Sequence, residues 1–248
     1  MIKGVDTAHK LTYSEAEAIS KCGLRFVGRY LVPNKLNTAW KALTAWETQD
    51  IRNNGLSILL LWETEASRAK KGKDAGDLDG KYAKELAEGM NIPTSCAIYF
   101  CVDYDAPQTD YQLIEEYLYA AKQAVSPYKC GVYGKADLIN SVKADCYMQC
   151  VAWSYGVVSD KTNVYQYEWQ KGDEALEIKS KTGVDVDMDR CEDMRSAGMW
   201  MPDAVSEDTE VIDAHKWCAD NKIVDDTMRD VSQFETMIYR YHKAFGAK

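Results

Sequence analysis

The stretch that most constrains the fold is residues 97–105, AIYFCVDYD, an apolar run that ends in two carboxylates. A run this apolar, without clean alternation, is typical of a strand buried on both faces, as in a parallel sheet. Side chains two apart on a strand point the same way, so we expect Asp103 and Asp105 on one face. Two acids at the end of a buried strand predict a chemical role, because unpaired carboxylates are costly to bury.

Apolar runs alternate with helical patterns along the chain. The predicted strands are residues 2–6, 24–31, 57–62, 97–105, 129–134, 150–155, 164–167 and 183–186. Helices are predicted at residues 14–21, 45–53 (with Thr44 and Glu47 as a capping box), before Met90, at 109–125 with Thr109 as cap, and at 136–146, and residues 70–80 are a predicted loop. The last three strands follow too closely for helices between them. This rhythm predicts an α/β fold, a modified TIM-type (β/α) barrel with helices missing between the last strands.

A chain of 248 residues is long enough for a barrel and a small appendage. We assign residues 1–198 to a catalytic barrel, 199–206 to a linker and 207–248 to a small C-terminal α-helical module with two amphipathic patterns. A module of that size is near the lower limit for folding alone, so we expect it to dock on the barrel or to form a homo-oligomer.

Composition excludes several classes of function. The formal net charge is −9, and no basic stripe suggests a nucleic-acid partner. No apolar run is long enough for membrane insertion, and Met1 leads directly into a predicted strand rather than a signal peptide. We expect the eight cysteines to be free, buried thiols. The spacing of Cys146 and Cys150 suits zinc, but no second Cys/His pair follows at ligand distance, so we expect no metal site there.

Polar side chains gather at the predicted carboxyl ends of the strands, where barrel active sites lie. They are Asp6, Arg29, Glu63, Asp103, Asp105, Tyr133, Trp153, Gln166 and Asp185. Several carboxylates without a Cys/His cluster point first to glycoside hydrolysis, with tryptophan and tyrosine stacking on sugars. Two alternatives stay open: the acids form salt bridges, for instance with Arg29, or they hold magnesium. Histidine-assisted nucleophilic catalysis is weakly supported, although His9 is close enough to Asp6 to line the site.

Several motifs occur together in the order of a known family: GVD at 4–6, FVGRYL at 26–31, LT at 43–44 with Glu47, IYFCVDYD at 98–105, GVYG at 131–134, WS at 153–154 and GVD at 183–185. Over roughly residues 1–195 the chain resembles the glycoside-hydrolase-like family catalogued as domain of unknown function 1906. That family is related to the family 25 lysozymes of phage endolysins and bacterial autolysins. The resemblance implies a modified barrel that cleaves β-1,4 glycan bonds of peptidoglycan without a cofactor, as an N-acetylmuramidase.

The resemblance also implies site roles. Asp105 would be the general acid and Asp103 would stabilise the cationic centre or a substrate acetamide, with Asp6 and Asp185 as an electrostatic frame. The predicted substrate-binding residues are Arg29, Glu63, Tyr133, Trp153 and Gln166. Related lysozymes carry glutamate where this chain has Asp105, whose side chain is shorter by one methylene. A catalytic carboxyl misplaced by about that length can lower the rate about a hundredfold.

The tail resembles one S-layer-homology repeat, from AHKW at 214–217 to MIYRY at 237–241. Such repeats bind cell-wall polymers. The sequence therefore predicts a bacteriophage endolysin that stays cytoplasmic until release and then acts on the bacterial cell wall. The alternative is a non-catalytic wall-glycan-binding or phage structural protein that keeps the barrel.

Overall fold

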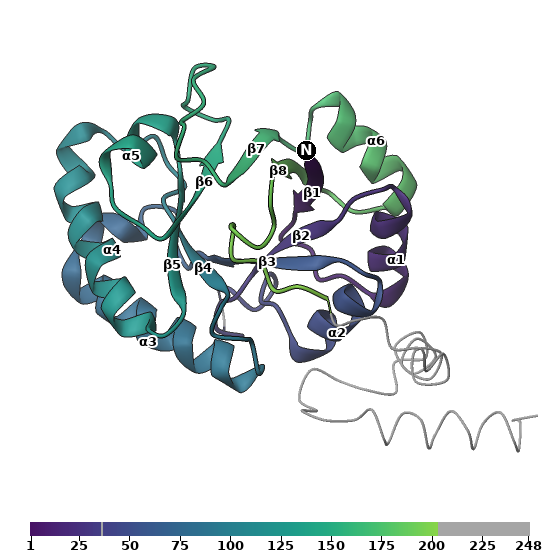
Figure 1. Cartoon of the computed structure of the whole chain (residues 1–248), viewed down its shortest axis with the longest axis horizontal. Coiled ribbons are helices and arrows are strands. Elements are labelled where there is room, and N and C mark those ends of the chain that lie inside the picture. Colours follow the sequence, from purple (N-terminus) through teal and green to yellow (C-terminus); the bar gives the residue numbers. More distant parts are fainter. Residues whose placement is uncertain (36, 203–248) are drawn as a thin grey trace, which may run out of the picture.

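The computed structural model describes residues 1–35 and 37–202. Eight strands close into a barrel in sequence order (Figure 1). They are β1 (Ile2–Asp6), β2 (Phe26–Tyr30), β3 (Ser57–Trp62), β4 (Ala97–Cys101), β5 (Lys129–Gly134), β6 (Cys146–Cys150), β7 (Val164–Glu168) and β8 (Asp187–Cys191). Neighbours from β1 to β7 pair in parallel, whereas β8 is antiparallel to both β7 and β1. The predicted α/β barrel is confirmed, and the predicted C-terminal module lies outside the described residues.

Helices cover the outside of the barrel (Figure 1). They are α1 (Tyr13–Lys21), α2 (Ala45–Asn53), α3 (Lys73–Gly89), α4 (Tyr111–Val125), α5 (Ala136–Ser141) and α6 (Asp173–Thr182), with short 3₁₀ turns at Arg68–Lys71 and Gln108–Asp110. Thr44 caps α2 as predicted, but the side chain of Glu47 does not complete the capping box. It binds the backbone of Leu11 and the guanidinium of Arg29 instead. The predicted cap Thr109 lies in the 3₁₀ turn before α4.

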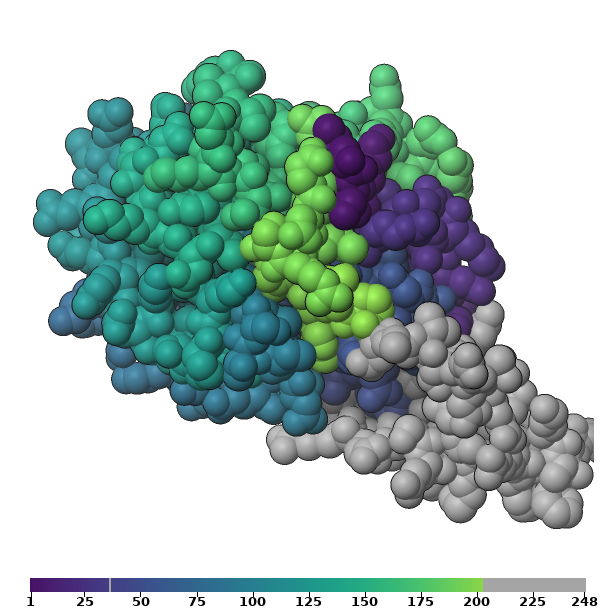
Figure 2. All heavy atoms as spheres, in the orientation of Figure 1, coloured from purple at the N-terminus to yellow at the C-terminus, as the bar shows by residue number. Residues whose placement is uncertain are grey.

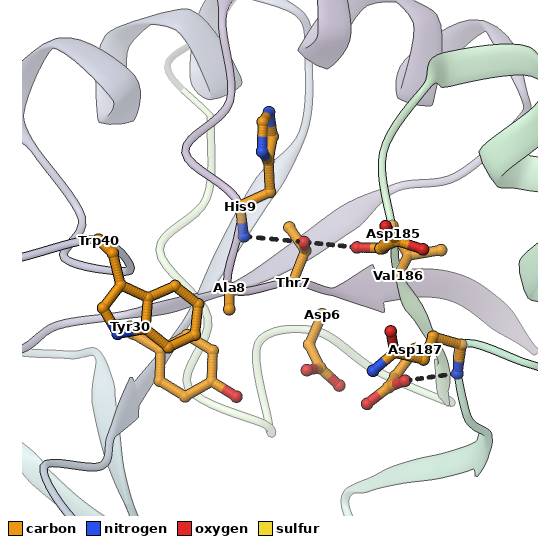
Figure 3. Close-up of a pocket in the computed structure, with 10 residues that line it drawn as sticks. Asp6, Thr7, Ala8, His9, Tyr30, Trp40, Asp185, Val186 and Asp187 are labelled. Atoms are coloured by element: carbon orange, nitrogen blue, oxygen red, sulfur yellow. Dashed lines mark hydrogen bonds between the residues drawn. The ribbon is translucent and has the colours of Figure 1, made fainter. Parts of the chain in front are cut away.

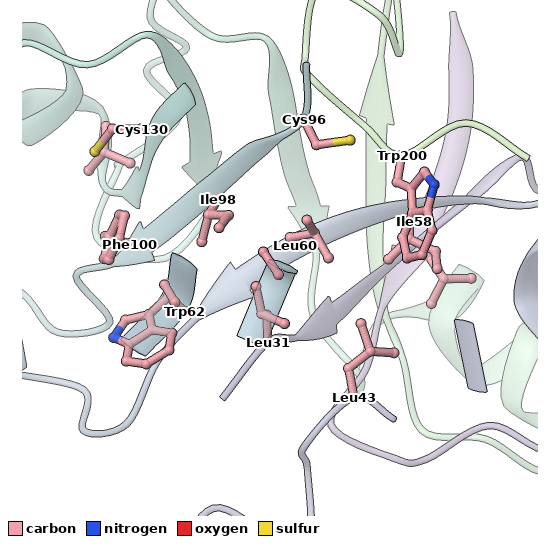
Figure 4. Packing of buried hydrophobic residues seen from close by; sticks show 14 of the residues in the cluster. Leu31, Leu43, Ile58, Leu60, Trp62, Cys96, Ile98, Phe100, Cys130 and Trp200 are labelled. Carbon is pink, nitrogen blue, oxygen red and sulfur yellow. The ribbon is translucent and has the colours of Figure 1, made fainter. Parts of the chain in front are cut away.

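The continuous apolar runs of the central strands are explained by burial on both faces. Alternate residues of β3 and β4 point outward beneath the helices, where Ile58, Leu60 and Trp62 lie beside Ile98 and Phe100 (Figure 4). The intervening residues, such as Leu59 and Tyr99, fill the barrel interior. The carboxyl ends of the strands thus rest on a packed interior.

The predicted loop at residues 70–80 is wrong, because α3 begins at Lys73 and runs to Gly89. The glycines that suggest a loop serve close helix packing. An added Cβ at Gly76 would lie 2.1 Å from the carbonyl oxygen of Tyr117 in α4, and one at Gly80 would lie 2.7 Å from that of Ala121. The two helices approach so closely only because these positions have no side chain.

Gly76→Ala is therefore expected to lower the free energy of unfolding by about 1–3 kcal/mol, since α3 and α4 must separate. Gly89→Ala is the matched control, because nothing lies within 4 Å of its added Cβ. That change is expected to be neutral or to stabilise by up to about 1 kcal/mol. Urea unfolding of both variants measures the difference, and equal midpoints would contradict this account of the packing.

Three predicted strand positions are wrong. β4 ends at Cys101, because the chain then turns and Asp103 N donates to Ala66 O at 3.1 Å. Asp103 and Asp105 therefore do not share a strand face. The sixth strand is Cys146–Cys150 rather than residues 150–155, so the predicted helix at 136–146 ends early, at Ser141. The eighth strand starts at Asp187, because residues 183–186 form the turn after α6.

The predicted lack of late helices is half right. Between β6 and β7 the described chain has no helix, and residues 151–163 cross back as a loop. The Gln149 side chain holds that loop, donating to Val157 O at 2.7 Å and accepting from Ser159 N at 2.8 Å. Between β7 and β8, however, α6 fills the connection and ends at Gly183 in a left-handed conformation (φ 78°).

Residues 192–202 close the amino-terminal end of the barrel. Their yellow-green atoms fill the middle of the face seen in Figure 2. Ala97 N donates to Gly198 O at 2.8 Å, and the Tyr99 hydroxyl donates to Ala197 O at 2.7 Å. Met199 and Trp200, which the sequence assigns to the linker, are buried. With this floor in place, the open end of the barrel is the one formed by the carboxyl ends of the parallel strands.

None of the described helices is both long and apolar enough to cross a membrane.

Candidate active site

The antiparallel pairing of β1 and β8 brings three carboxyl groups together. Asp6 lies opposite Asp187, and Gly4 lies opposite Asp189. Residues that face each other across two strands point to the same side, as do residues two apart on one strand. Asp6, Asp187 and Asp189 therefore all point into the barrel. Gly28 leaves the room that Asp6 needs, because a Cβ there would lie 2.6 Å from the Cβ of Asp6.

A glutamine on β7 holds two of these acids. Gln166 Nε2 donates to Asp6 Oδ2 at 2.8 Å and to Asp187 Oδ2 at 3.2 Å. The Tyr133 hydroxyl donates to Gln166 Oε1 at 3.0 Å, which fixes the orientation of the amide. Gln170 N also donates to Asp187 Oδ1 at 2.7 Å. The two carboxyl groups are thus held side by side by side chains from β5 and β7 and by the backbone of one loop.

Two further acids, Asp103 and Glu63, lie beside this group at the ends of β4 and β3. Glu63 Oε2 forms an ion pair with Lys41 Nζ at 3.1 Å, and the ammonium lies 4.3 Å from the ring centroid of Tyr30. Asp103 also interacts electrostatically with Lys41 and lies within hydrogen-bonding reach of Tyr133. We call Asp6, Glu63, Asp103, Asp187 and Asp189 the acid cluster.

The electrostatics of the acid cluster favour protonated carboxyl groups. Burial raises the pKa of Asp103 and of Glu63, and the charge of Lys41 lowers both in part. Burial and the negative charge of Asp103 raise the pKa of Asp187 to about 6, against a bond from Gln170 N that lowers it. Burial and the neighbouring acids raise the pKa of Asp6 and Asp189 well above the usual range. Carboxyl groups this close together in a buried site do not all ionise easily, so protonation of some members favours ionisation of the others.

A cavity of about 400 Å³ opens onto the acid cluster. It is lined by Asp6, Thr7, Ala8, His9, Tyr30, Trp40, Gln170, Asp185, Val186 and Asp187. Figure 3 shows Trp40 and Tyr30 on one side, Asp187 on the other and Asp6 between them. The Trp40 side chain is 63% exposed at the rim. A cavity with an exposed aromatic wall and carboxyl groups at its base suits a sugar ring, which has an apolar face and many hydroxyl groups.

Two of the predicted acids point away from the acid cluster. Asp105 is exposed and its Oδ1 pairs with Lys135 Nζ at 2.6 Å. The side chain of Asp185 is 55% exposed and pairs with Lys179 Nζ at 2.6 Å, although the residue lines the cavity. Asp187, two residues later, occupies the last-strand position that the sequence gives to Asp185. The general-acid role of Asp105 stays a prediction, and the geometry favours a carboxyl inside the cluster.

The predicted binding residues divide in the same way. Glu63, Tyr133 and Gln166 lie in or against the acid cluster. Arg29 is fully buried and does not line the cavity. Its guanidinium binds Glu47 and the backbone oxygens of Thr7 and Lys41. Glu47 is not among the acids predicted for the site, all of which lie in the described ranges, so Arg29 forms no salt bridge with any of those acids. Trp153 follows β6 in a left-handed conformation (φ 56°) instead of lying on it.

The sequence interpretation missed Lys41, Trp40, Asp187 and Asp189. A signal for the two acids is present in residues 185–189, DVDMD, since alternate residues of one strand share a face. No comparable signal marks Lys41 or Trp40, because they lie in the loop between β2 and α2. The seven cysteines in the described ranges are free, as predicted, and all but Cys22 are buried. In those ranges no group of three or more His, Cys, Asp or Glu side chains is arranged to hold a metal ion.

The amino-acid sequence is similar to a family of known domains and to a protein of Bacillus subtilis. The model of the Rv2525c-like, glycoside hydrolase-like domain matches residues 17–244, which runs past the predicted boundary at residue 198. FadG of Bacillus subtilis (strain 168), an uncharacterized protein, is 31% identical over 111 residues. Those residues are 44% of this chain and 19% of FadG, so the chain spans a small part of that relative.

Solved structures share the fold. The Mycobacterium tuberculosis Tat-secreted protein Rv2525c, in complex with L-tartrate, superposes with a TM-score of 0.68 and 22% identity, over 80% of this chain and 98% of that one. The catalytic domain of endolysin ply40, from bacteriophage P40 of Listeria monocytogenes, superposes with a TM-score of 0.53 and 12% identity, over 79% of this chain and 95% of that one. At such identities the likeness shows the fold alone.

Proposed function

Since this chain belongs to the family of Rv2525c-like, glycoside hydrolase-like domains, we propose that its acid cluster hydrolyses glycosidic bonds of a bacterial cell-wall glycan. The observation that carries the proposal is the cavity, which places one partly protonated carboxyl, Asp187, beside a second carboxyl, Asp6. Glycoside hydrolysis needs a proton donor at the leaving oxygen and a negative group near the oxocarbenium-like centre.

In the proposed reaction Asp187 is the general acid. A pKa of about 6 keeps a useful fraction of its carboxyl protonated near neutral pH. The two hydrogen bonds from Gln170 N and Gln166 Nε2 fix the carboxyl at the cavity wall. Asp6 supplies, in its ionised form, the negative charge that stabilises the cationic centre, and the hydrogen bond from Gln166 favours that form against the effect of burial. Trp40 at the rim stacks on a sugar ring of the chain that enters the cavity.

Peptidoglycan is the proposed substrate, and β-1,4 cleavage of the N-acetylmuramidase type is the proposed specificity. Support comes from the resemblance to lysozyme-related barrels and from the shared fold of the ply40 catalytic domain. The acidic chain, with a formal charge of −9, suits a glycan better than a polyanion.

A second candidate is a protein that binds wall glycan without cutting it. The observation that favours it is the position of Asp105, which pairs with Lys135 outside the acid cluster. The site then lacks the carboxyl that the lysozyme resemblance makes the general acid. The cavity and the rim tryptophan serve binding equally well.

The test incubates the purified protein with cell walls from several Gram-positive hosts and measures turbidity, new reducing ends and co-sedimentation. Hydrolysis predicts clearing with new reducing ends, and mass spectrometry of the fragments identifies the bond from the new reducing sugar. Co-sedimentation without new reducing ends on any wall would establish the binding candidate. Neither clearing nor sedimentation would contradict both.

A further inference from the structure

Beneath the cavity lies a buried pair of carboxyl groups, Asp6 and Asp189, to which neither the sequence nor the proposed reaction assigns a joint role. Asp189 has no exposed surface, and no N–H or O–H group of another residue in the described ranges donates to its oxygens. The group within hydrogen-bonding reach is the carboxyl of Asp6. Two ionised carboxylates within hydrogen-bonding reach of each other would repel strongly in a buried site, so the pair must share one proton.

From this geometry we propose that Asp189 is a permanently protonated positioning residue, which donates its proton in a hydrogen bond to Asp6 and keeps the negative charge of the pair on Asp6.

The hydrogen-bonding partners decide which member holds the proton. Asp6 Oδ2 already accepts from Gln166 Nε2 at 2.8 Å, and an amide N–H stabilises the ionised form of the group it binds. Asp189 receives no such donor, so an ionised Asp189 would be a buried charge without compensation. As a neutral acid, Asp189 can supply the one donor that the second oxygen of Asp6 needs. Charge and proton are therefore assigned to opposite members of the pair.

The groups around the pair reinforce this assignment. The ionisable groups that interact with Asp6 or Asp189 are Asp187 and Cys191 on β8, Cys101 on β4, Asp103 after β4, Tyr30 on β2, Tyr133 on β5 and Tyr167 on β7. All are acidic or neutral. Burial and the charges of Asp6 and Asp187 raise the pKa of Asp189 well above the usual range, which keeps it protonated. Lys41, the nearby cation, acts on Asp103 and Glu63 instead.

For the proposed hydrolysis, the pair gives Asp6 a fixed charge and a fixed orientation below the reacting sugar. That catalytic meaning rests on the proposed function. The position of the proton does not, so the two can be tested separately. The substitution Asp189→Asn keeps a neutral donor of nearly the same shape, whereas Asp189→Leu fills the space with a side chain that donates nothing.

The test follows the ¹³Cγ signals of aspartate-labelled protein by NMR between pH 4 and 8, in wild type, Asp189→Asn and Asp189→Leu. We expect the wild-type Asp189 signal to keep its protonated position throughout. Asp189→Asn should leave the titration midpoint of Asp6 nearly unchanged. Asp189→Leu should raise that midpoint by about one pH unit or more, because the charged form loses a donor.

An Asp189 signal that moves to the ionised position anywhere between pH 4 and 8 would overturn the proposal, as would an Asp6 midpoint that shifts by more than about one unit in Asp189→Asn. These two measurements decide it even where Asp189→Leu does not fold. Cell-wall hydrolysis forms a separate arm, in which Asp189→Asn keeps the wild-type pH profile and Asp189→Leu does not. A protein that cuts no glycan contradicts the proposed function and leaves the NMR result intact.

Discussion

Asp187→Asn is expected to lower the rate of cell-wall hydrolysis by about 10²–10⁴-fold, because an amide cannot give a proton to the leaving oxygen. Wild-type activity should fall as pH rises above about 6, where burial and the charge of Asp103 place the pKa of Asp187. The residual activity of Asp187→Asn should not show this fall in activity above about pH 6. Reducing-end release between pH 4 and 9 measures both effects.

The same substitution separates chemistry from stability. A carboxyl whose pKa is raised on folding stabilises the protein fully below its unfolded pKa, here near 3.8, and loses that contribution as pH rises through about 6. Asp187→Asn should therefore raise the free energy of unfolding by about 1 kcal/mol at pH 8 and change it little at pH 4. Denaturant unfolding at both pH values measures this gain. A variant that is inactive and less stable at pH 8 would indicate a structural role only.

Matched controls come from Asp105 and Asp185, the two acids that the sequence predicts in the site and whose side chains lie outside the acid cluster. Asp105→Asn and Asp185→Asn each remove the charge of a half-exposed carboxylate that pairs with a lysine, so each should keep activity within about twofold and stability within about 0.5 kcal/mol. A large loss of activity in Asp105→Asn would restore it as the general acid and contradict the assignment to Asp187.

Local patterns predicted the barrel because strand composition and helix caps are local properties. The predicted ranges for β1, β3, β5 and α2 match the observed ones, and each is a short apolar run or a capped helix. The errors arise where distant contacts decide. Residues 70–80 are polar and glycine-containing, yet α3 begins at Lys73, and its glycines Gly76 and Gly80 pack closely against α4. The extent of β4 is set by the loop that holds Asp103, which the apolar run does not reveal.

In the candidate site, too, local sequence predicts some residues and contacts between distant strands decide others. That acids gather at the carboxyl ends of the strands follows from the barrel topology, and Asp6, Glu63 and Asp103 were predicted on that basis. Which last-strand acid faces Asp6 depends on the antiparallel register of β8 against β1, which aligns Asp187 rather than Asp185. Register is a property of the pair of strands, and neither strand encodes it alone.

Arg29 and Glu47 form a buried ion pair that holds the wall of the cavity. Arg29 has no exposed surface and Glu47 only 3%. Besides Glu47, the guanidinium binds Thr7 O and Lys41 O, which lie beside the cavity residues Ala8 and Trp40. Glu47 Oε1 also accepts from Leu11 N at 2.9 Å. One buried pair thus ties the loops after β1 and β2 to the start of α2.

Glu47→Ala is expected to lower the free energy of unfolding by about 3–5 kcal/mol, because it leaves the Arg29 guanidinium buried without its counter-charge. Glu65→Ala is the matched control. It breaks an ion pair of similar geometry with Lys71, in which both side chains are nearly half exposed, and should cost less than about 1 kcal/mol. Unfolding by guanidinium chloride, analysed with the same denaturant dependence for all variants, measures both changes in the free energy of unfolding.

Adding Arg29→Met to Glu47→Ala should recover part of the loss, since no unpaired charge then remains in the core. A double variant that loses the full sum of the two single changes would show that the two side chains act independently.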